Sequence, residues 1–436
     1  MKKKILFGLL CATAGLSLAS CGGRDTSHTI VFWNTMGDNL QQVLNPAIEE
    51  FEKKYPGWTV ESSQIGGYDD VRNQTISYIA AGKNPDLVYC YPDHVALYNK
   101  SKQVVDLNTY INDPELGYTE EQIADFVEGY YAEGSAYGDG AMYTLPFSKS
   151  TEVLYYNKTV FEEQNLDVPT TWEEMEDVIK ILKLRFPESI PLGIDSEDNL
   201  FITTAAQKGA PYTSATGDSH YLFDNEQNRA TVQMFKDWYD KDYMTTKYIY
   251  GTYTSGLFVS TSSERSFMSI GSTGGASHQV PDKNAFEVGI SPIPTFEGTD
   301  LKCISQGPSL CMLKQASEEK MEMTWRFMKE FLLTTEFQAE FSMVSGYNPV
   351  LKSTFNLPAY QAFLSNATGT EEGITALSAQ ACLTLSETNS FFVSDAFVGS
   401  STARTEVGKI IQNVLKLGTS LDEAFATAIT NCNKDN

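Results

Sequence analysis

The stretch from Tyr143 to Met175 reads YTLPFSKSTEVLYYNKTVFEEQNLDVPTTWEEM and combines strand and helix patterns. A run rich in β-branched and aromatic residues from Thr151 to Tyr156 predicts a strand. A short helix is expected from Thr159 to Gln164, and Thr171 and Glu174 have the spacing of a capping box that opens a longer helix. Strand, helix, loop and helix in this order are typical of an α/β domain.

The chain before this stretch also alternates between strand and helix patterns. Strands are expected at Thr29 to Trp33, Thr59 to Gln64 and Pro85 to Tyr91. Apolar residues at near-helical spacing over 43–51, and a second helical pattern from about Asp70 to Ala81, predict helices between these strands. This β-α-β-α-β order predicts a small α/β lobe with a mainly parallel sheet.

The chain after this stretch is expected to be richer in helices. Helices dominate Trp172 to Trp238, and a strand at Phe267 to Gly271 leads into a glycine-rich turn. Strands at Phe286 to Thr295 and Leu301 to Leu313 are expected to return the chain to the first lobe. A helical pair follows from Lys314 to Phe341, and further helices close the chain. The apolar stripe of that pair is assigned to core packing and consists of Met321, Trp325, Met328 and Leu332.

The first residues have the pattern of a sorting signal. Three lysines at positions 2–4 precede the apolar run Ile5 to Ala19, which is too short to cross a bilayer comfortably. Leu18-Ala19-Ser20-Cys21 resembles a bacterial lipobox, which implies a signal peptide over 1–20, a lipid on Cys21 and a tether over 21–27. Each buried methylene contributes about 0.8 kcal/mol, so several acyl chains would hold the protein at a membrane. Ordinary secretion is the alternative.

Composition and charge limit the possible partners. The 436 residues carry a net charge of -24, and loss of the three leader lysines would make the chain more acidic still. Such a surface argues against binding nucleic acid or anionic lipid, although an arginine inside a pocket can still hold an anion. A hydrophobic content of 42% is that of a folded chain, and the length fits two or three domain-sized units.

The sequence gives little sign of catalysis, a metal or a cofactor. No nucleophile elbow, Walker loop, HExxH or GxGxxG motif is present, and the four histidines have no metal-ligand spacing. The cysteines after Cys21 are expected to be buried free thiols, with a Cys303–Cys311 bridge as the alternative. These cysteines are Cys90, Cys303, Cys311, Cys382 and Cys432. We therefore expect neither an enzyme nor a bound cofactor, and no residues are assigned to a metal site.

The opening stretch closely resembles the lobe-crossing segment of extracellular solute-binding proteins of sugar-type ABC importers. The matching residues are Leu145-Pro146-Phe147, Val153-Leu154-Tyr155-Tyr156-Asn157-Lys158, Phe161 and Thr171-Trp172-Glu173-Glu174. This resemblance implies an α/β fold of the type II periplasmic-binding class, with two lobes, hinge crossings and a ligand cleft between them. Lobe 1 would comprise residues 28–146 and 306–347, and lobe 2 would comprise 147–305 and 348–436.

Within this family the chain looks most like the glycerol-phosphate-binding branch. The similar segments are Phe32-Trp33-Asn34-Thr35-Met36-Gly37, Gly307-Pro308-Ser309-Leu310, Ser345-Gly346-Tyr347-Asn348-Pro349 and an arginine, Arg404, before a hydrophobic helix. The resemblance implies that Tyr68, Ser150, Gly307, Tyr347 and Arg404 contact the ligand. A guanidinium can hold a phosphate or adjacent hydroxyls through two parallel hydrogen bonds, whereas a solvated Arg404 or one paired with Glu406 is the alternative.

Two departures from this branch leave the ligand open between a glycerol phosphate compound and a neutral sugar or oligosaccharide. The acidic ligand contact expected after the third strand is not matched in register, because Pro92 falls near that place and Asp93 follows it. A tryptophan expected in the second lobe is not evident around Ser196 to Phe201. We nevertheless include Asp93 among the candidate ligand-binding residues, because it lies at an interlobe turn beside aromatic residues.

The resemblance predicts a lipid-anchored substrate-binding protein at the cell surface or in the periplasm. It would act as a monomer and deliver a small-molecule ligand to the permease subunits of an ABC importer. A surface glycan-processing hydrolase and a pure adhesion lipoprotein are the alternatives. The first would need two carboxyl groups about 5–10 Å apart, and the second would bind its partner on an exposed face.

Overall fold

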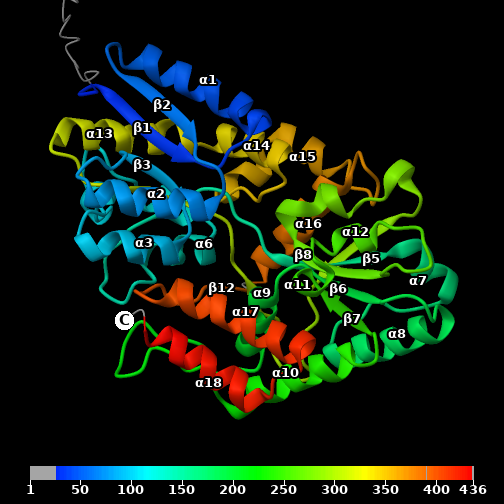
Figure 1. The fold of residues 1–436 in the computed structure, drawn as a ribbon. Coiled ribbons are helices and arrows are strands. Elements are labelled where there is room, and N and C mark those ends of the chain that lie inside the picture. The colour runs from blue at the N-terminus through cyan, green and yellow to red at the C-terminus, as the bar shows by residue number, and fades with distance from the viewer. Residues whose placement is uncertain (1–25, 389, 435–436) are drawn as a thin grey trace, which may run out of the picture.

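A computed structural model describes residues 26–388 and 390–434 (Figure 1). The expected signal peptide, the lipidation site at Cys21 and most of the tether therefore lie outside the described residues. Within the described ranges the longer strands form two sheets of five strands each. None of the helices in these ranges has the length and apolar character needed to cross a bilayer.

The first sheet has the strand order β2-β1-β3-β11-β4. Strand β1 pairs in parallel with β2 and β3, whereas β11 runs antiparallel to β3 and β4. Its strands are β1 Thr29–Asn34, β2 Thr59–Gln64, β3 Leu87–Cys90, β4 Leu145–Pro146 and β11 Ser309–Met312. Helices α1 Asp38–Lys54 and α2 Tyr68–Ala80 connect its parallel strands, as the alternating pattern predicted.

The second sheet has the order β7-β6-β8-β5-β9. Its strands are β5 Glu152–Asn157, β6 Leu192–Ile194, β7 Met244–Thr246, β8 Met268–Ser272 and β9 Val288–Pro292. Strand β5, which the opening stretch predicted, lies between β8 and β9 and is antiparallel to both. The expectation that residues 286–295 return the chain to the first lobe was wrong, because β9 pairs with β5 in the second sheet, whereas the later strand β11 joins the first sheet.

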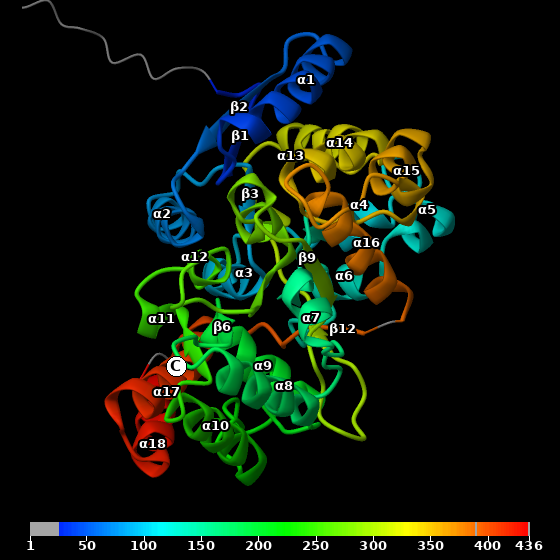
Figure 2. The ribbon, with the colours of Figure 1, turned by 90° about the vertical axis from the view of Figure 1, so that its right-hand side faces the viewer.

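Long helices cover the two ends of the molecule. Helices α1, α13 and α14 lie at one end with the first sheet, and α8, α10, α17 and α18 lie at the other (Figures 1 and 2). Apart from α1, the bounds of these helices are α8 Trp172–Arg185, α10 Glu226–Tyr239, α13 Glu318–Phe327, α14 Thr335–Ser345, α17 Ser400–Leu417 and α18 Leu421–Cys432. Three further helices are α9 Glu197–Gln207, α15 Pro358–Leu364 and α16 Ile374–Glu387. A π-helical turn, Met328–Leu332, joins α13 to α14.

The remaining α-helices and strands of the described residues are short. They are α3 Pro92–Tyr98, α4 Asn108–Ile111, α5 Glu120–Asp125, α6 Glu128–Ala132, α7 Lys158–Gln164, α11 Lys247–Tyr250, α12 Ser255–Phe258, β10 Cys303–Ile304 and β12 Phe391–Phe392.

Several local predictions are confirmed by side-chain contacts. The capping box of α8 forms, because Thr171 Oγ1 accepts from the Glu174 N–H at 3.1 Å and Glu174 Oε2 accepts from the Thr171 N–H at 3.3 Å. The stripe on the helical pair is core, since Trp325, Met328 and Leu332 are buried. Cys303 and Cys311 are buried free thiols and do not form the alternative bridge.

Three chain segments pass between the two sheets side by side. Lys149 pairs with Asn348 through N–H···O bonds of 3.3 and 2.6 Å, and Ser150 pairs with Gln306 through bonds of 2.8 and 3.0 Å. Because these antiparallel bridges pair backbone groups from all three crossings, the crossings form one connected unit. The lobe boundaries proposed from the sequence stay a prediction.

A buried ion pair lies at this junction. Lys149 Nζ donates to Glu133 Oε2, and both side chains are buried. The ammonium also donates to the Gly307 carbonyl oxygen at 2.9 Å and to Ser309 Oγ at 3.0 Å. Burial raises the pKa of Glu133, and the neighbouring Lys149 opposes this shift. The crossings are therefore arranged around a charge that must keep its partners, because burying a lone ion is costly.

Lys149→Met should lower the free energy of unfolding by about 3–5 kcal/mol, because it leaves the Glu133 carboxyl group buried without its cation. Denaturant unfolding followed by circular dichroism measures this loss. The double variant Lys149→Met/Glu133→Gln is the control and should recover much of the stability. Equal losses in the single and double variants would contradict this explanation.

Candidate ligand-binding cleft

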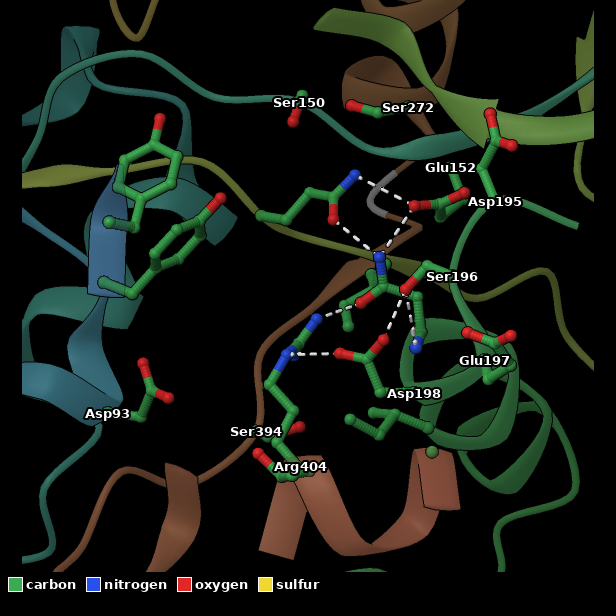
Figure 3. Close-up of a pocket in the computed structure, with 18 of the residues that line it drawn as sticks. Asp93, Ser150, Glu152, Asp195, Ser196, Glu197, Asp198, Ser272, Ser394 and Arg404 are labelled. Atoms are coloured by element: carbon green, nitrogen blue, oxygen red, sulfur yellow. Dashed lines mark hydrogen bonds and ion pairs between the residues drawn. The ribbon is translucent and has the colours of Figure 1, made fainter. Parts of the chain in front are cut away.

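A cleft of about 1020 Å³ lies between the three crossing segments and several helices. Its walls include residues of α2 and α3 on one side and of α9 and α17 on the other, with crossing residues between them (Figure 3). Cavities of this size are typical of sites that enclose a small molecule.

The structure brings five of the six candidate residues to this cleft. Tyr68, Asp93, Ser150, Tyr347 and Arg404 all line it. These five residues are spread over more than three hundred positions of the sequence, so the tertiary fold brings them together. Their role in ligand binding stays a prediction.

Gly307 is not among the residues that line the cleft. It adopts φ +99°, and a Cβ there would lie 2.4 Å from the carbonyl oxygen of Ser148. Only glycine tolerates both the dihedral angle and this close approach. Gly307 therefore shapes the crossing and accepts from Lys149, while its neighbour Gln306 faces the cleft.

An aromatic wall forms one side of the cleft. The ring centres of Tyr68 and Tyr91 are 4.7 Å apart in an edge-to-face arrangement, and the hydroxyls of Tyr68 and Tyr347 are 3.3 Å apart. Burial raises the pKa of both Tyr68 and Tyr347, which keeps them as neutral phenols. Such rings offer apolar faces together with hydroxyl groups that donate and accept.

Asp93 reaches the cleft from the first turn of α3. Strand β3 ends at Cys90, and Pro92 takes the first helical position, where its missing N–H costs nothing. An acidic residue in that first turn is favoured by the helix dipole. About 20% of the Asp93 side chain is exposed, and Figure 3 shows it across the cleft from Asp195 and Glu197.

Buried amides surround the carboxyl group of Glu152 at the start of β5. Asn199 Nδ2 donates to Glu152 Oε1 at 2.7 Å and to Gln306 Oε1 at 2.8 Å, and Gln306 Nε2 donates to Glu152 Oε1 at 3.2 Å. Burial raises the pKa of Glu152 to about 7, although the Asn199 hydrogen bond opposes the shift. Glu152 therefore exchanges its proton near neutral pH, at the junction of the crossings and α9.

The guanidinium group of Arg404 on α17 bonds to side chains in the first turn of α9. Its Nε donates to Asp198 Oδ2 at 2.7 Å, and its Nη2 donates to Asn199 Oδ1 (Figure 3). Ser196 holds the other carboxylate oxygen, because its Oγ donates to Asp198 Oδ1 at 2.5 Å. Burial lowers the pKa of Arg404, but the nearby Asp198 and Asp93 outweigh this effect and raise it. The alternative pairing with Glu406 does not form, since Glu406 bonds to Lys409 and Asn431.

Residues 26–388 and 390–434 contain no group of three or more His, Cys, Asp or Glu side chains placed to hold a metal ion. Several polar groups of the cleft are instead paired with one another, as Asn199 is with Glu152 and Arg404 is with Asp198.

The sequence matches a known family over most of its length. Residues 46–366 match the family described as bacterial extracellular solute-binding protein. This chain belongs to that family. It is 24% identical over 377 residues to the sn-glycerol-3-phosphate-binding periplasmic protein UgpB of Shigella flexneri and to that of Escherichia coli K12, with 82% of each chain covered.

Solved structures of solute-binding proteins share the fold. UgpB of Mycobacterium tuberculosis in complex with glycerophosphocholine aligns with a TM-score of 0.74 at 18% identity, covering 93% of this chain and 98% of that one. The sugar-binding protein MalE of Xanthomonas citri aligns with a TM-score of 0.73 at 19% identity, covering 93% and 96%. The predicted family and the type II periplasmic-binding fold are thus confirmed, and the relatives are binding proteins.

Sequence reasoning missed several residues that complete the cleft. Tyr91, Glu152, Asp198, Asn199 and Gln306 all line it. One signal was available for Glu152, because a carboxylate inside an otherwise apolar strand needs a reason to be there. Asp198 and Arg404 are 206 positions apart in the sequence, and no local sequence pattern predicts that they pair.

Glu152→Gln should change how stability depends on pH. The pKa of Glu152 is about 7 in the folded chain against an ordinary 4.5, so the folded state binds its proton more tightly. This contribution is fully present below about pH 4.5 and is lost as the pH rises through 7. Between pH 5 and 8, wild type should therefore lose stability relative to the variant, by at most about 1.4 kcal/mol per pH unit.

Denaturant unfolding at a series of pH values measures this difference, and Glu188→Gln, at an exposed glutamate, is the control. A gap between wild type and Glu152→Gln that stays constant from pH 5 to 8 would contradict the assignment.

Proposed function

We propose that this chain captures a carbohydrate or glycerol-phosphate-type solute in its cleft and delivers it to the permease subunits of an ABC importer. The observation that carries the proposal is the cleft itself, in which aromatic rings and polar side chains from distant segments converge. Membership of the solute-binding family supports the same function. The proposal includes no chemical conversion of the solute, no cofactor and no metal.

The residues of the cleft suit a polyhydroxylated solute. The faces of Tyr68 and Tyr91 can pack against C–H surfaces, while Asp93, Asn199 and Arg404 can bond to oxygen atoms. Micromolar affinity needs about 8 kcal/mol, which several such contacts can share.

The crossings supply a hinge for this capture. Lobe 1 is proposed to comprise 28–146 and 306–347, and lobe 2 to comprise 147–305 and 348–436. The paired segments at Lys149–Asn348 and Ser150–Gln306 connect the sheets, so small dihedral changes there can rotate one lobe against the other. A solute that contacts both lobes shifts the population toward the closed form, which is the form that the permease would receive.

Calorimetric titration tests capture directly, with maltose, maltotriose, sn-glycerol 3-phosphate and glycerophosphocholine as probes. At least one should bind with a dissociation constant in the micromolar range or below. Asp93→Asn should weaken that binding by about tenfold or more, since a hydrogen bond to a charged group contributes about 1.5–3 kcal/mol. Asp237→Asn, an exposed change on α10 outside the cleft, should leave the affinity unaltered. Equal affinities in all three proteins would contradict the assignment of the site.

The proposed location is the cell surface or periplasm, with a lipid on Cys21 as the membrane anchor of a monomer. Cys21→Ser should move the protein from the membrane fraction to the soluble fraction and abolish metabolic labelling with a fatty acid, because the acyl chains provide the attachment. Cys11→Ser, a cysteine of the preceding signal peptide, is the matched control and should keep both the membrane location and the label. A membrane-bound, unlabelled Cys21→Ser protein would contradict lipid anchoring there.

A further inference from the structure

The cleft carries more negative than positive side chains. Among the described residues, eight carboxyl groups line it against four lysine and arginine side chains, and the excess remains when Glu133, which is paired with Lys149, and Glu152, whose pKa is about 7, are left out of the comparison. In a confined space of low dielectric such an excess repels anions more strongly than the same charges would in water. A phosphoester would therefore need a cation that is free to meet it.

Each of the four cations already has a partner. Arg404 lies 2.7 Å from Asp198, Arg72 lies 3.0 Å from Asp69, and Lys409 lies 2.5 Å from Glu406. Lys247 packs on an aromatic face, with its Nζ 3.6 Å from the ring centre of Tyr253. Arg404 is the most deeply committed of them, because Asn199 accepts from its second guanidinium nitrogen.

The first turn of α9 is closed to anions in the same way. A helix N-terminus attracts phosphate through its free N–H groups and its dipole. Here Ser196 Oγ accepts from the Asn199 N–H at 3.3 Å, and Glu197 and Asp198 place two carboxylates in that turn. The side chains of this turn therefore already neutralise the positive end of α9.

Hydrogen-bond acceptors, in contrast, remain available to a ligand. Within the described residues, the nearest basic group to the Asp93 carboxylate is His94 Nε2 at 4.0 Å, and burial lowers the pKa of that imidazole toward the neutral form. A sugar hydroxyl can donate to Asp93, whereas a phosphate would meet it as a like charge.

We propose that Asp198 excludes phosphoesters from the cleft by retaining Arg404, so that the protein takes a neutral polyhydroxylated solute. This inference rests on the proposed function and narrows its ligand class. The ligand class inferred for this chain differs from that of the relatives named for glycerol 3-phosphate, although they share its fold. Asp198 is thus a specificity-determining residue that acts through Arg404.

The test compares calorimetric titrations of sn-glycerol 3-phosphate into wild type and Asp198→Asn. Removing the charge of Asp198 should free Arg404 for two parallel bonds to the phosphate and strengthen phosphoester binding by about tenfold or more. Adding Arg404→Met to Asp198→Asn should abolish the gain. Glu197→Gln is the matched control, because it removes one charge from the same helical turn and leaves the Asp198–Arg404 pair intact. Asp198→Ala, with its melting curve, serves as a second variant in case the amide disturbs folding.

Titration of maltose and maltotriose in parallel keeps this inference separate from the proposed function. Phosphoester binding to wild type as tight as to Asp198→Asn, or an equal gain in Glu197→Gln, would overturn the role of Asp198 while leaving solute capture in place. If no probe binds wild type, the proposed capture of these solutes is contradicted. The comparison of phosphoester binding among the variants still decides the role of Asp198.

Discussion

The ammonium group of Lys149 lies where the crossing segments meet, and its burial constrains everything around it. A desolvated cation needs an anion and further acceptors, and here Glu133, the Gly307 carbonyl and Ser309 supply them. Glu133 lies on one segment and Gly307 and Ser309 lie together on another, so the need to satisfy one charge fixes the position of the 307–309 segment relative to the segment around 133. The antiparallel pairing of Lys149 with Asn348 adds the third crossing to the same unit.

The cleft is a consequence of this arrangement. Ser150 and Gln306 belong to the crossings and line the cleft. The hydrogen bonds of Gln306 and Asn199 to Glu152 extend the polar network into α9. From Asn199 the network reaches Arg404 on α17, at the opposite end of the sequence. The buried ion pair at the crossings and the polar network of the cleft are therefore connected through the paired backbone of Ser150 and Gln306.

Much of this fold was predictable because its signals are local. The alternating pattern gave β1, β2 and α2 within a few residues, and the capping box located the start of α8. Strand partners are not local, and β9 was misassigned because only its tertiary pairing with β5 places it in the second sheet. The candidate site followed the same rule. The family resemblance indicated Arg404. Its partner Asp198 lies in the stretch around 196–201, where the resemblance failed because the expected tryptophan is absent. Charge on a side chain is visible in a sequence, whereas its neutralisation by a distant partner is not.

We propose that two lobes hinge about the crossings and close on a solute. Pulsed electron–electron resonance measures this directly, with spin labels at the exposed positions Ser77 on α2 and Lys241 beyond α10. The label distance should shorten, and its distribution should narrow, when maltotriose is added at a saturating concentration. Replacing Lys149 should broaden the distribution before any sugar is added. A distance that is the same with and without bound sugar would contradict the account.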